Sequence, residues 1–144
     1  MKREETIDHN VKMLWHAIYR MYNQQAVKHD ITTSIGFVLL IINSKEGTPA
    51  TKIAPLMGLE SRSLTRMLKS MEEKGFIYRE KDPNDGRSVR IFLTDLGKQK
   101  REISRATVLE FNTTANKLIE KEKLDTFFEV IEQINNLIDT KSIF

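Results

Sequence analysis

Basic and hydroxyl side chains gather in residues 61–74, and their chemistry suits the phosphates and bases of a nucleic acid. Ammonium and guanidinium groups bind phosphate, and an arginine can also recognise guanine through two hydrogen bonds. Small hydroxyls near the start of a helix can contact phosphate or base edges. The candidate contact residues are Ser61, Arg62, Ser63, Thr65, Arg66 and Lys69.

These side chains need an element that turns them outward together, and the sequence pattern predicts a helix. Apolar residues stand at positions i, i+3, i+4 and i+7, namely Leu64, Met67, Leu68 and Met71. At about 100° per residue, Arg62, Arg66 and Lys69 fall on the opposite side. The alternative to a nucleic-acid-binding face is an ordinary solvated face, which most charged helix faces are. The flanking segments have to distinguish these two interpretations.

The preceding segment predicts the first helix of a helix-turn-helix. Thr48 offers an N-cap and Pro49 a first helical residue. A shorter apolar stripe follows, and Gly58 ends that helix in a tight turn. Two short helices joined by a few residues with a glycine are typical of a helix-turn-helix, whose second helix enters the major groove of DNA.

The following segment predicts a β-hairpin. Residues 76–79 and 88–93 have strand character, and residues 81–87 between them are rich in turn formers. A hairpin directly after a helix-turn-helix is a wing. Arg87 in its loop is placed to reach an adjacent minor groove, which attracts arginine when it is narrow, and the neighbouring Ser88 is a further candidate contact.

Together these segments resemble the multiple-antibiotic-resistance regulator (MarR) family of bacterial repressors. The resemblance rests on LTRMLKSMEEKGFIYRE (64–80), DPNDGRSVRIFLT (82–94) and LTDLGKQ (93–99). It implies a mainly α-helical fold with a small β-hairpin wing, in which a winged helix-turn-helix is joined to a helical dimerisation region. It also implies that Arg87 inserts into the minor groove and that Asp85 helps to hold it; the alternative for Asp85 is an ordinary turn residue.

The resemblance implies the function of a homodimeric, sequence-specific DNA-binding transcription regulator. It implies a repressor that leaves a near-palindromic operator when it binds a small ligand. The alternative is a winged-helix module that binds protein and has no DNA-binding activity, because a fold does not fix a function. An acidic or apolar outer face on residues 61–74 would have favoured that alternative, whereas this face is basic.

Two residues depart from the pattern of the family. Pro55 lies inside the first predicted helix, where it should disturb the hydrogen bond back to Thr51, which predicts a kink or a 3₁₀ turn. Glu60 stands where relatives commonly carry a small capping residue. Its charge suits a helix N-terminus, but it would also face phosphate. Both residues bear on the pose of the recognition helix.

Composition supports the same function. The net charge of the 144 residues is only +3, yet residues 61–91 hold eight basic and five acidic side chains, so the whole excess lies there. The chain has no cysteine, which excludes disulfides, thiolate zinc sites and the cysteine switches of some relatives. No apolar run approaches the roughly 18 residues of a membrane helix, and no signal region follows the charged N-terminus, so we expect a cytoplasmic protein.

No motif predicts an enzyme, a cofactor or a metal site. The sequence lacks the signatures of phosphate-binding loops, serine hydrolases and zinc proteases. His9 and His16 share a helix face two turns apart, too far to hold one metal without further ligands. We therefore expect neither catalysis nor a bound metal or cofactor.

The domain organisation predicted is a winged helix-turn-helix in residues 31–97, with a helical dimerisation region formed by residues 1–30 and 98–144. The last predicted helix is more apolar than a peripheral helix requires. Its apolar residues recur at intervals of three and four, and they are Leu124, Phe127, Phe128, Ile131, Ile134 and Ile138. We expect this helix and the first predicted helix, residues 5–28, to form a dimer interface.

A site for a small apolar or aromatic ligand is expected where the end helices meet the winged domain. The resemblance supplies this expectation, and the residues that could form the site are Trp15, Tyr19, Tyr22, Gly36 and Phe37. The alternative is that this aromatic row belongs to the core, as such rows more often do, and that the glycine permits close helix packing.

Overall fold

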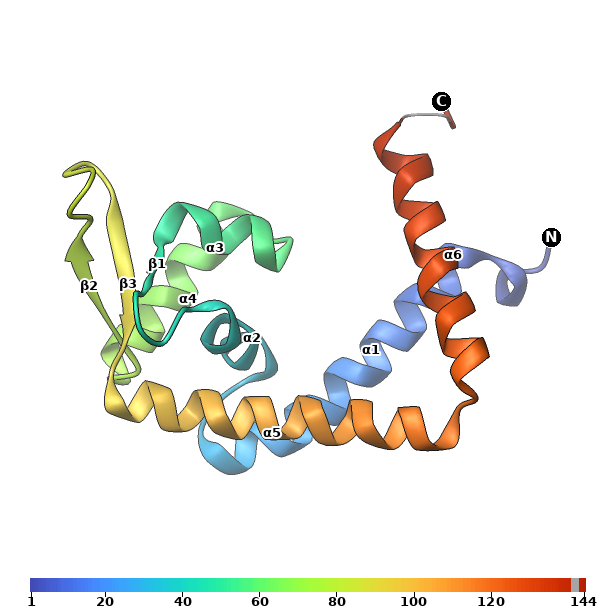
Figure 1. The fold of residues 1–144 in the computed structure, drawn as a ribbon, viewed down its shortest axis with the longest axis horizontal. Coiled ribbons are helices and arrows are strands. Elements are labelled where there is room, and N and C mark those ends of the chain that lie inside the picture. The colour runs from blue at the N-terminus through green and yellow to red at the C-terminus, as the bar shows by residue number, and fades with distance from the viewer. Residues whose placement is uncertain (141–142) are drawn as a thin grey trace. The chain divides into compact units, whose positions relative to one another are not determined.

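The computed structural model describes residues 1–140 and 143–144, whose internal packing divides the chain into two units, residues 1–107 and 108–144. Most of the elements are helices, and a three-stranded antiparallel sheet accompanies them, which confirms the fold class (Figure 1). The unit boundary falls within α5. In chain order the elements are η1 (Arg3–Glu5), α1 (Ile7–Ala26), η2 (Val27–His29), α2 (Thr33–Ile41), β1 (Thr48–Pro49), α3 (Ala50–Met57), α4 (Ser61–Glu73), β2 (Ile77–Lys81), β3 (Val89–Leu93), α5 (Asp95–Leu118) and α6 (Lys121–Asp139).

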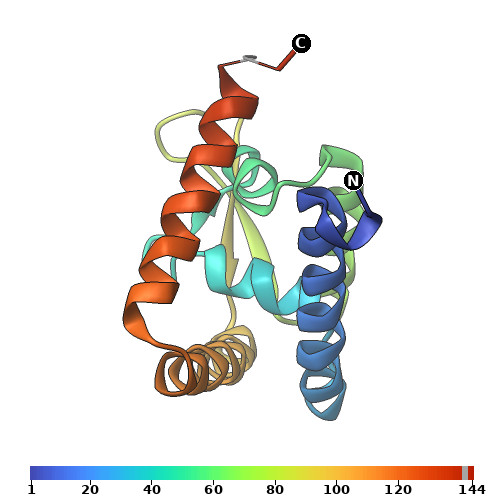
Figure 2. The same cartoon turned by 90° about the vertical axis from the view of Figure 1, so that its right-hand side faces the viewer.

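The core of the first unit is built around α2, which is apolar on nearly every side. Val38, Leu39 and the adjoining Ile42 are fully buried, and they share one cluster with Ile53 of α3 and Met71 of α4. Figure 2 shows α2 crossing the middle of this unit. A helix that is apolar on nearly every side needs apolar neighbours around it, which explains the central position of α2 in this unit.

The start of the helix-turn-helix differs from the prediction. Thr48 and Pro49 form the short strand β1, which pairs with β3 so that Thr48 lies opposite Ile91. Helix α3 begins only at Ala50, with Pro49 as its N-cap residue, so the roles predicted for Thr48 and Pro49 were wrong. Thr48 instead accepts a hydrogen bond from the backbone N–H of Asn43 at 2.9 Å. Proline suits an edge strand such as β1, because it has no N–H to donate to the ladder.

Helix α3 runs as an α-helix through Pro55, so the predicted 3₁₀ turn is wrong. The proline lies in the second half of an eight-residue helix, and its ring is exposed. Gly58 follows in the left-handed conformation, with φ of 63°, and ends α3 as predicted. The N–H of Leu59 then bonds to the carbonyl of Ala54 at 3.1 Å, which closes the turn into α4.

The hairpin of β2 and β3 is fastened to the start of α5. The hydroxyl oxygen of Thr94 accepts from the N–H of Gly97 at 3.0 Å, so Thr94 caps α5. The same hydroxyl donates to the carbonyl of Gly75. Gly97 packs so closely that a β-carbon added to it would collide with the carbonyl of Phe76. These contacts set the direction in which α5 leaves the sheet.

The second unit consists of the end of α5 and of α6, and much of its apolar surface is exposed. Phe127 and Phe128 are 45% and 60% exposed, and Ile138 is similarly open. Residues 119–120 separate α5 from α6, which begins at Lys121. The dimerisation region of residues 1–30 and 98–144 stays a prediction, and residues 141–142 within it lie outside the described residues. Over the described part of the chain, no helix is long and apolar enough to cross a membrane.

Candidate nucleic-acid interface

Helix α4 has one buried face and one exposed basic face, as its periodicity predicted. Leu64, Leu68 and Met71 are at most 4% exposed and belong to the core cluster. The side chains predicted to contact DNA all lie on the exposed part of the helix, and they are Ser61, Arg62, Ser63, Thr65, Arg66 and Lys69. Core packing therefore fixes α4 so that these groups point to solvent together, while their contact with DNA stays a prediction.

The first turn of α4 leaves backbone N–H groups open. Glu60 is the N-cap residue, but its side chain makes no capping hydrogen bond. The first helical bond within this turn runs from the N–H of Leu64 to the carbonyl of Glu60 at 3.3 Å. The preceding N–H groups and the positive end of the helix dipole form a suitable place for a phosphate. The Thr65 hydroxyl donates to the carbonyl of Ser61 at 2.8 Å, so it can still accept from a ligand but not donate to one.

The wing loop is organised by the Asp85 side chain. One carboxylate oxygen accepts from the backbone N–H of Arg87 at 3.0 Å, and the other accepts from the Ser88 hydroxyl at 3.1 Å. The carbonyl of Asp85 also accepts from the N–H of Ser88 at 3.0 Å. Asp85 thus holds the backbone of Arg87 in a turn and leaves the exposed guanidinium free to extend outward. Asp85 was expected either to help hold Arg87 or to be an ordinary turn residue. In the structure its carboxylate does both, because the turn that it forms includes the backbone of Arg87.

Two ion pairs at the wing were missed from the sequence. Arg79 of β2 pairs with Glu72 of α4 at 2.6 Å, which links the wing to the recognition helix. Arg90 of β3 pairs with Asp82 at 3.4 Å, and Asp82 is only 9% exposed. In the sequence, the only sign of the second ion pair was the charged Arg90 between apolar positions of a predicted strand. That sign did not indicate Asp82 as its partner.

Four of the five residues predicted to bind a ligand, Trp15, Tyr19, Tyr22 and Phe37, are brought together in the first unit. Trp15 stacks on Phe37 at 5.9 Å between ring centroids, and Phe37 meets Tyr22 edge-on at 6.0 Å. The Tyr19 hydroxyl lies 3.0 Å from the hydroxyl of Ser34. Burial raises the pKa of Tyr22 above its usual value. Trp15 remains 47% exposed, so this aromatic group is core at one end and surface at the other.

Gly36 allows α2 and α5 to approach each other closely. A β-carbon at this position would lie 3.0 Å from the hydroxyl oxygen of Ser104, which is itself buried. Close packing is therefore sufficient to explain the glycine, and its contact with a ligand stays a prediction.

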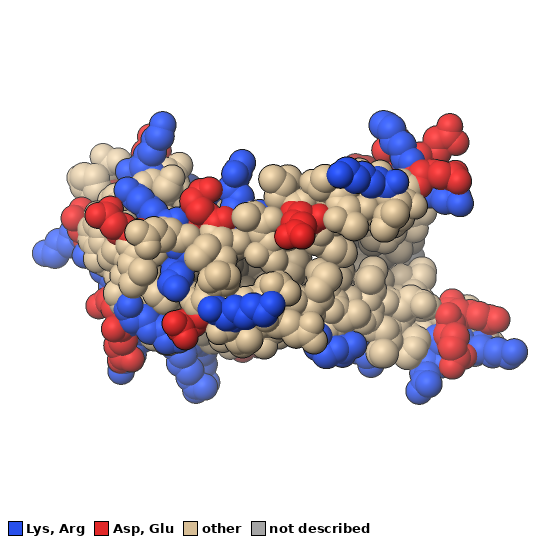
Figure 3. Space-filling model, turned by 90° about the horizontal axis from the view of Figure 1, so that it is seen from below, with Lys and Arg blue, Asp and Glu red and all other residues tan. Residues whose placement is uncertain are grey.

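Basic side chains are not gathered in one patch on the face shown in Figure 3, where Lys and Arg are mixed with Asp and Glu. The candidate interface is therefore defined by position, as the exposed side of α4 together with the wing loop.

The described residues contain no group of three or more His, Asp or Glu side chains that could hold a metal ion.

Comparisons with other sequences match this winged region. The model of the MarR family matches residues 31–89. The HTH-type transcriptional regulator TtmR of Methylorubrum extorquens is 37% identical over 83 residues, which cover 58% of this chain and 43% of TtmR. The HTH-type transcriptional regulator SarZ of Staphylococcus epidermidis is 30% identical over 101 residues, which cover 67% of this chain and 68% of SarZ. The chain thus spans less than half of TtmR and two thirds of SarZ.

Solved structures share the fold. The MepR–DNA complex of S. aureus superimposes with a TM-score of 0.83 at 22% identity and covers 91% of this chain and 97% of MepR. PcaV of Streptomyces coelicolor, in complex with its natural ligand, gives a TM-score of 0.80 at 18% identity over 94% and 96% of the two chains. At such low identities the likeness shows the arrangement of the elements.

Proposed function

Because the chain belongs to the MarR family of transcription regulators, we propose that it binds operator DNA as a homodimer, through a winged helix-turn-helix formed by residues 31–97. The observation that carries this proposal is the two-sided helix α4. Its apolar side is locked in the core, and Arg62, Arg66 and Lys69 stand on the exposed side. A helix held in this way can enter a major groove as a rigid body.

In the proposed complex, α4 lies in the major groove and the wing loop lies over the adjacent minor groove. The six predicted contact side chains of α4 (Ser61, Arg62, Ser63, Thr65, Arg66 and Lys69) contact phosphates and base edges. Arg87 enters the minor groove beside Ser88. MepR, which shares the fold, has been solved with DNA. A two-fold symmetric dimer would require two half-sites about one helical turn apart.

The test begins with selection of duplexes from a random DNA pool, followed by affinity measurements on the selected site. Arg66→Ala and Arg87→Ala are each expected to lower the affinity by about 1–3 kcal/mol, because each removes a base or phosphate contact. Arg20→Ala is the matched control, since it removes the same charge from the exposed surface of α1. Stability should change little in all three, because the side chains are exposed.

Salt dependence separates the kinds of contact. A lost phosphate contact flattens the salt dependence of binding, whereas a lost base contact relaxes the sequence preference at one position. Failure of the wild-type protein to select any duplex at low salt would overturn the proposal. The remaining function would then be that of a protein-binding winged helix.

Regulation is proposed to be repression in the cytoplasm, relieved by a small aromatic ligand. Trp15, half exposed and stacked on Phe37, offers an aromatic surface next to the hydroxyl pair of Tyr19 and Ser34. PcaV, a protein of the same fold, has been solved with its natural ligand. A ligand can release DNA only if it binds the form of the protein with low DNA affinity more tightly than the other form.

The ligand proposal can be tested by the fluorescence of Trp15, the single tryptophan of the chain. Phenolic and other aromatic acids should change this fluorescence and release operator DNA over the same concentration range. Phe37→Ala should weaken both effects, because it removes the ring on which Trp15 stacks. Absence of both signals at millimolar concentrations would rule out regulation at this group of residues.

A further inference from the structure

Arg90 occupies the point at which the sheet narrows from three strands to two. Strand β1 pairs with β3 only at Ile91 and Arg90, whereas β2 pairs with β3 as far as Val89. Beyond Arg90 only β2 and β3 remain paired, through Lys81 and Val89, and the loop that carries Arg87 follows. A two-stranded segment is only marginally stable by itself, so the position of the wing loop relative to the sheet needs support.

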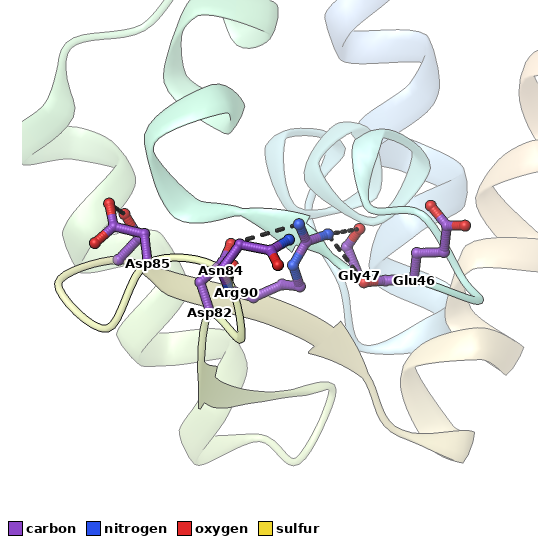
Figure 4. Close-up of polar contacts among 7 residues, drawn as sticks. Glu46, Gly47, Asp82, Asn84, Asp85 and Arg90 are labelled. Atoms are coloured by element: carbon purple, nitrogen blue, oxygen red, sulfur yellow. Dashed lines mark hydrogen bonds and ion pairs between the residues drawn. The ribbon is translucent and has the colours of Figure 1, made fainter.

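The side chain of Arg90 supplies that support by contacting two loops at once. One terminal nitrogen lies 3.4 Å from the carboxylate of Asp82, at the base of the wing loop. The other donates to the carbonyls of Glu46 and Gly47, at 3.1 Å and 3.4 Å. Figure 4 shows the guanidinium between these groups, with Asp85 further out along the loop. The ion pair is largely shielded from water, since the side chains of Arg90 and Asp82 are 22% and 9% exposed.

Each of the two loops is internally ordered. Asp82 accepts from the N–H of Asn84 at 2.9 Å and donates its own N–H to the carbonyl of Ser88. On the other side, the Asn43 side chain accepts from the N–H groups of Lys45 and Glu46, at 2.9 Å and 3.0 Å. Arg90 therefore joins two formed turns.

The loop before β1 also lies directly against β3. A β-carbon at Gly47 would come within 2.7 Å of the carbonyl oxygen of Ile91, and Gly47 has a φ of 67° that favours glycine. This close approach brings the carbonyls of Glu46 and Gly47 within reach of Arg90.

We propose that the Asp82–Arg90 pair is a positioning device for DNA binding: it fixes the wing loop to the 43–47 loop, and so fixes Arg87 relative to the helix-turn-helix. The inference rests on the proposed function and adds a residue that acts on the DNA contact without touching DNA. All the acceptors named lie within the protein, and both terminal nitrogens of the guanidinium are committed to them, while the Nε is buried. The effect of Arg90 on affinity is therefore carried by Arg87.

Asp82→Asn provides the sharpest test, because positioning and simple electrostatics predict opposite signs. The asparagine keeps the oxygen that accepts from Asn84 but loses the ion pair with Arg90. Removing a negative charge near DNA should tighten binding if the charge acts only through the electrostatic field. We expect instead that affinity for the selected duplex falls about tenfold. Arg20→Gln, which alters a charge on α1, serves as the control variant.

A double-mutant cycle with Arg87→Ala identifies the path of the effect. If Asp82 acts through Arg87, Asp82→Asn causes no further loss in the Arg87→Ala background, and the two changes are strongly non-additive. Arg90→Lys keeps the charge but cannot bond to both loops in the same geometry, so it should weaken binding less than Arg90→Gln. Circular dichroism and thermal unfolding establish that each variant is folded. If Arg90→Gln does not fold, the affinity of Arg90→Lys for the selected duplex is compared with that of the wild-type protein instead.

The possible results separate this inference from the proposed function. Weaker binding by Asp82→Asn that disappears in the Arg87→Ala background supports the positioning role. Unchanged or tighter binding by Asp82→Asn, with weaker binding by Arg87→Ala, overturns the positioning role alone. Equal losses by Asp82→Asn in both backgrounds also overturn it. Full affinity of Arg87→Ala overturns both the minor-groove contact and the inference built on it.

Discussion

Asp85 and Arg87 are joined through the backbone: a carboxylate oxygen of Asp85 accepts the N–H of Arg87 at 3.0 Å. The second carboxylate oxygen accepts from the hydroxyl of Ser88, so one side chain bonds to both residues that follow Gly86. The sequence resemblance had implied that Asp85 helps to hold Arg87. The geometry gives that role a mechanism, in which the carboxylate shapes the turn and the guanidinium remains exposed.

The effect of substitutions at Asp85 on operator affinity should therefore depend on whether the new side chain can accept hydrogen bonds, and not on whether it is charged. Asp85→Ala removes both acceptors and should weaken operator binding several-fold, because the loop loses its preferred turn. Asp85→Asn keeps one acceptor for the N–H of Arg87 and should bind more tightly than Asp85→Ala. Affinity measurements on both variants at one salt concentration test this order. Equal affinity of Asp85→Ala and the wild-type protein would contradict it.

Replacement of Glu60 should improve both stability and DNA binding. The Glu60 side chain makes no capping hydrogen bond at the start of α4, whereas serine is a favoured N-cap. Glu60→Ser should raise the free energy of unfolding by about 0.5 kcal/mol, since a new cap is partly offset by the lost charge–dipole attraction. Binding should tighten because a negative charge leaves the phosphate-facing surface. Denaturant unfolding and operator titration measure the two effects. Unchanged binding by Glu60→Ser would show that the carboxylate faces away from phosphate, and weaker binding would contradict the prediction.

Gly97 should be the least replaceable glycine tested. An alanine there would collide with the carbonyl of Phe76, at the junction of the hairpin with α5. Gly97→Ala should lower the free energy of unfolding by about 1–3 kcal/mol, because the backbone has to shift. Gly86→Ala in the wing loop is the control, since no atom lies within 4 Å of the added carbon. Similar stabilities of the two variants would contradict the close packing at Gly97.

The exposed apolar face of α6 should be the dimer interface. Phe128 is 60% exposed in the single chain, so Phe128→Asp should leave the folding of the chain largely intact. In a dimer that covers this residue, the same change would bury an unpaired charge at a cost of several kcal/mol. We expect a monomer in analytical ultracentrifugation and loss of operator binding. Gln133→Asp places the same charge on an exposed polar position of α6 and should remain dimeric. A dimeric Phe128→Asp variant would place the interface elsewhere.

The sequence by itself determined the features that depend on local periodicity and turn chemistry. Leu64, Leu68 and Met71 recur at helical intervals, so the side of α4 that carries Arg62, Arg66 and Lys69 had to face away from the core. Gly58 ends α3 in the left-handed conformation, which glycine adopts without steric cost. Thr94 caps α5 because its hydroxyl reaches an N–H only three residues away.

Only the tertiary structure decided the features that join distant segments. A strand of two residues has no periodicity to recognise, and Thr48 and Pro49 become β1 only because β3 lies beside them. Arg90 reaches the carbonyl of Glu46 across 44 positions of the chain, and the register of β1 against β3 brings them together. The ion pair with Asp82 depends in addition on the fold of the wing loop. Side-chain types indicate which groups can bond, but strand register and loop packing determine which of them meet.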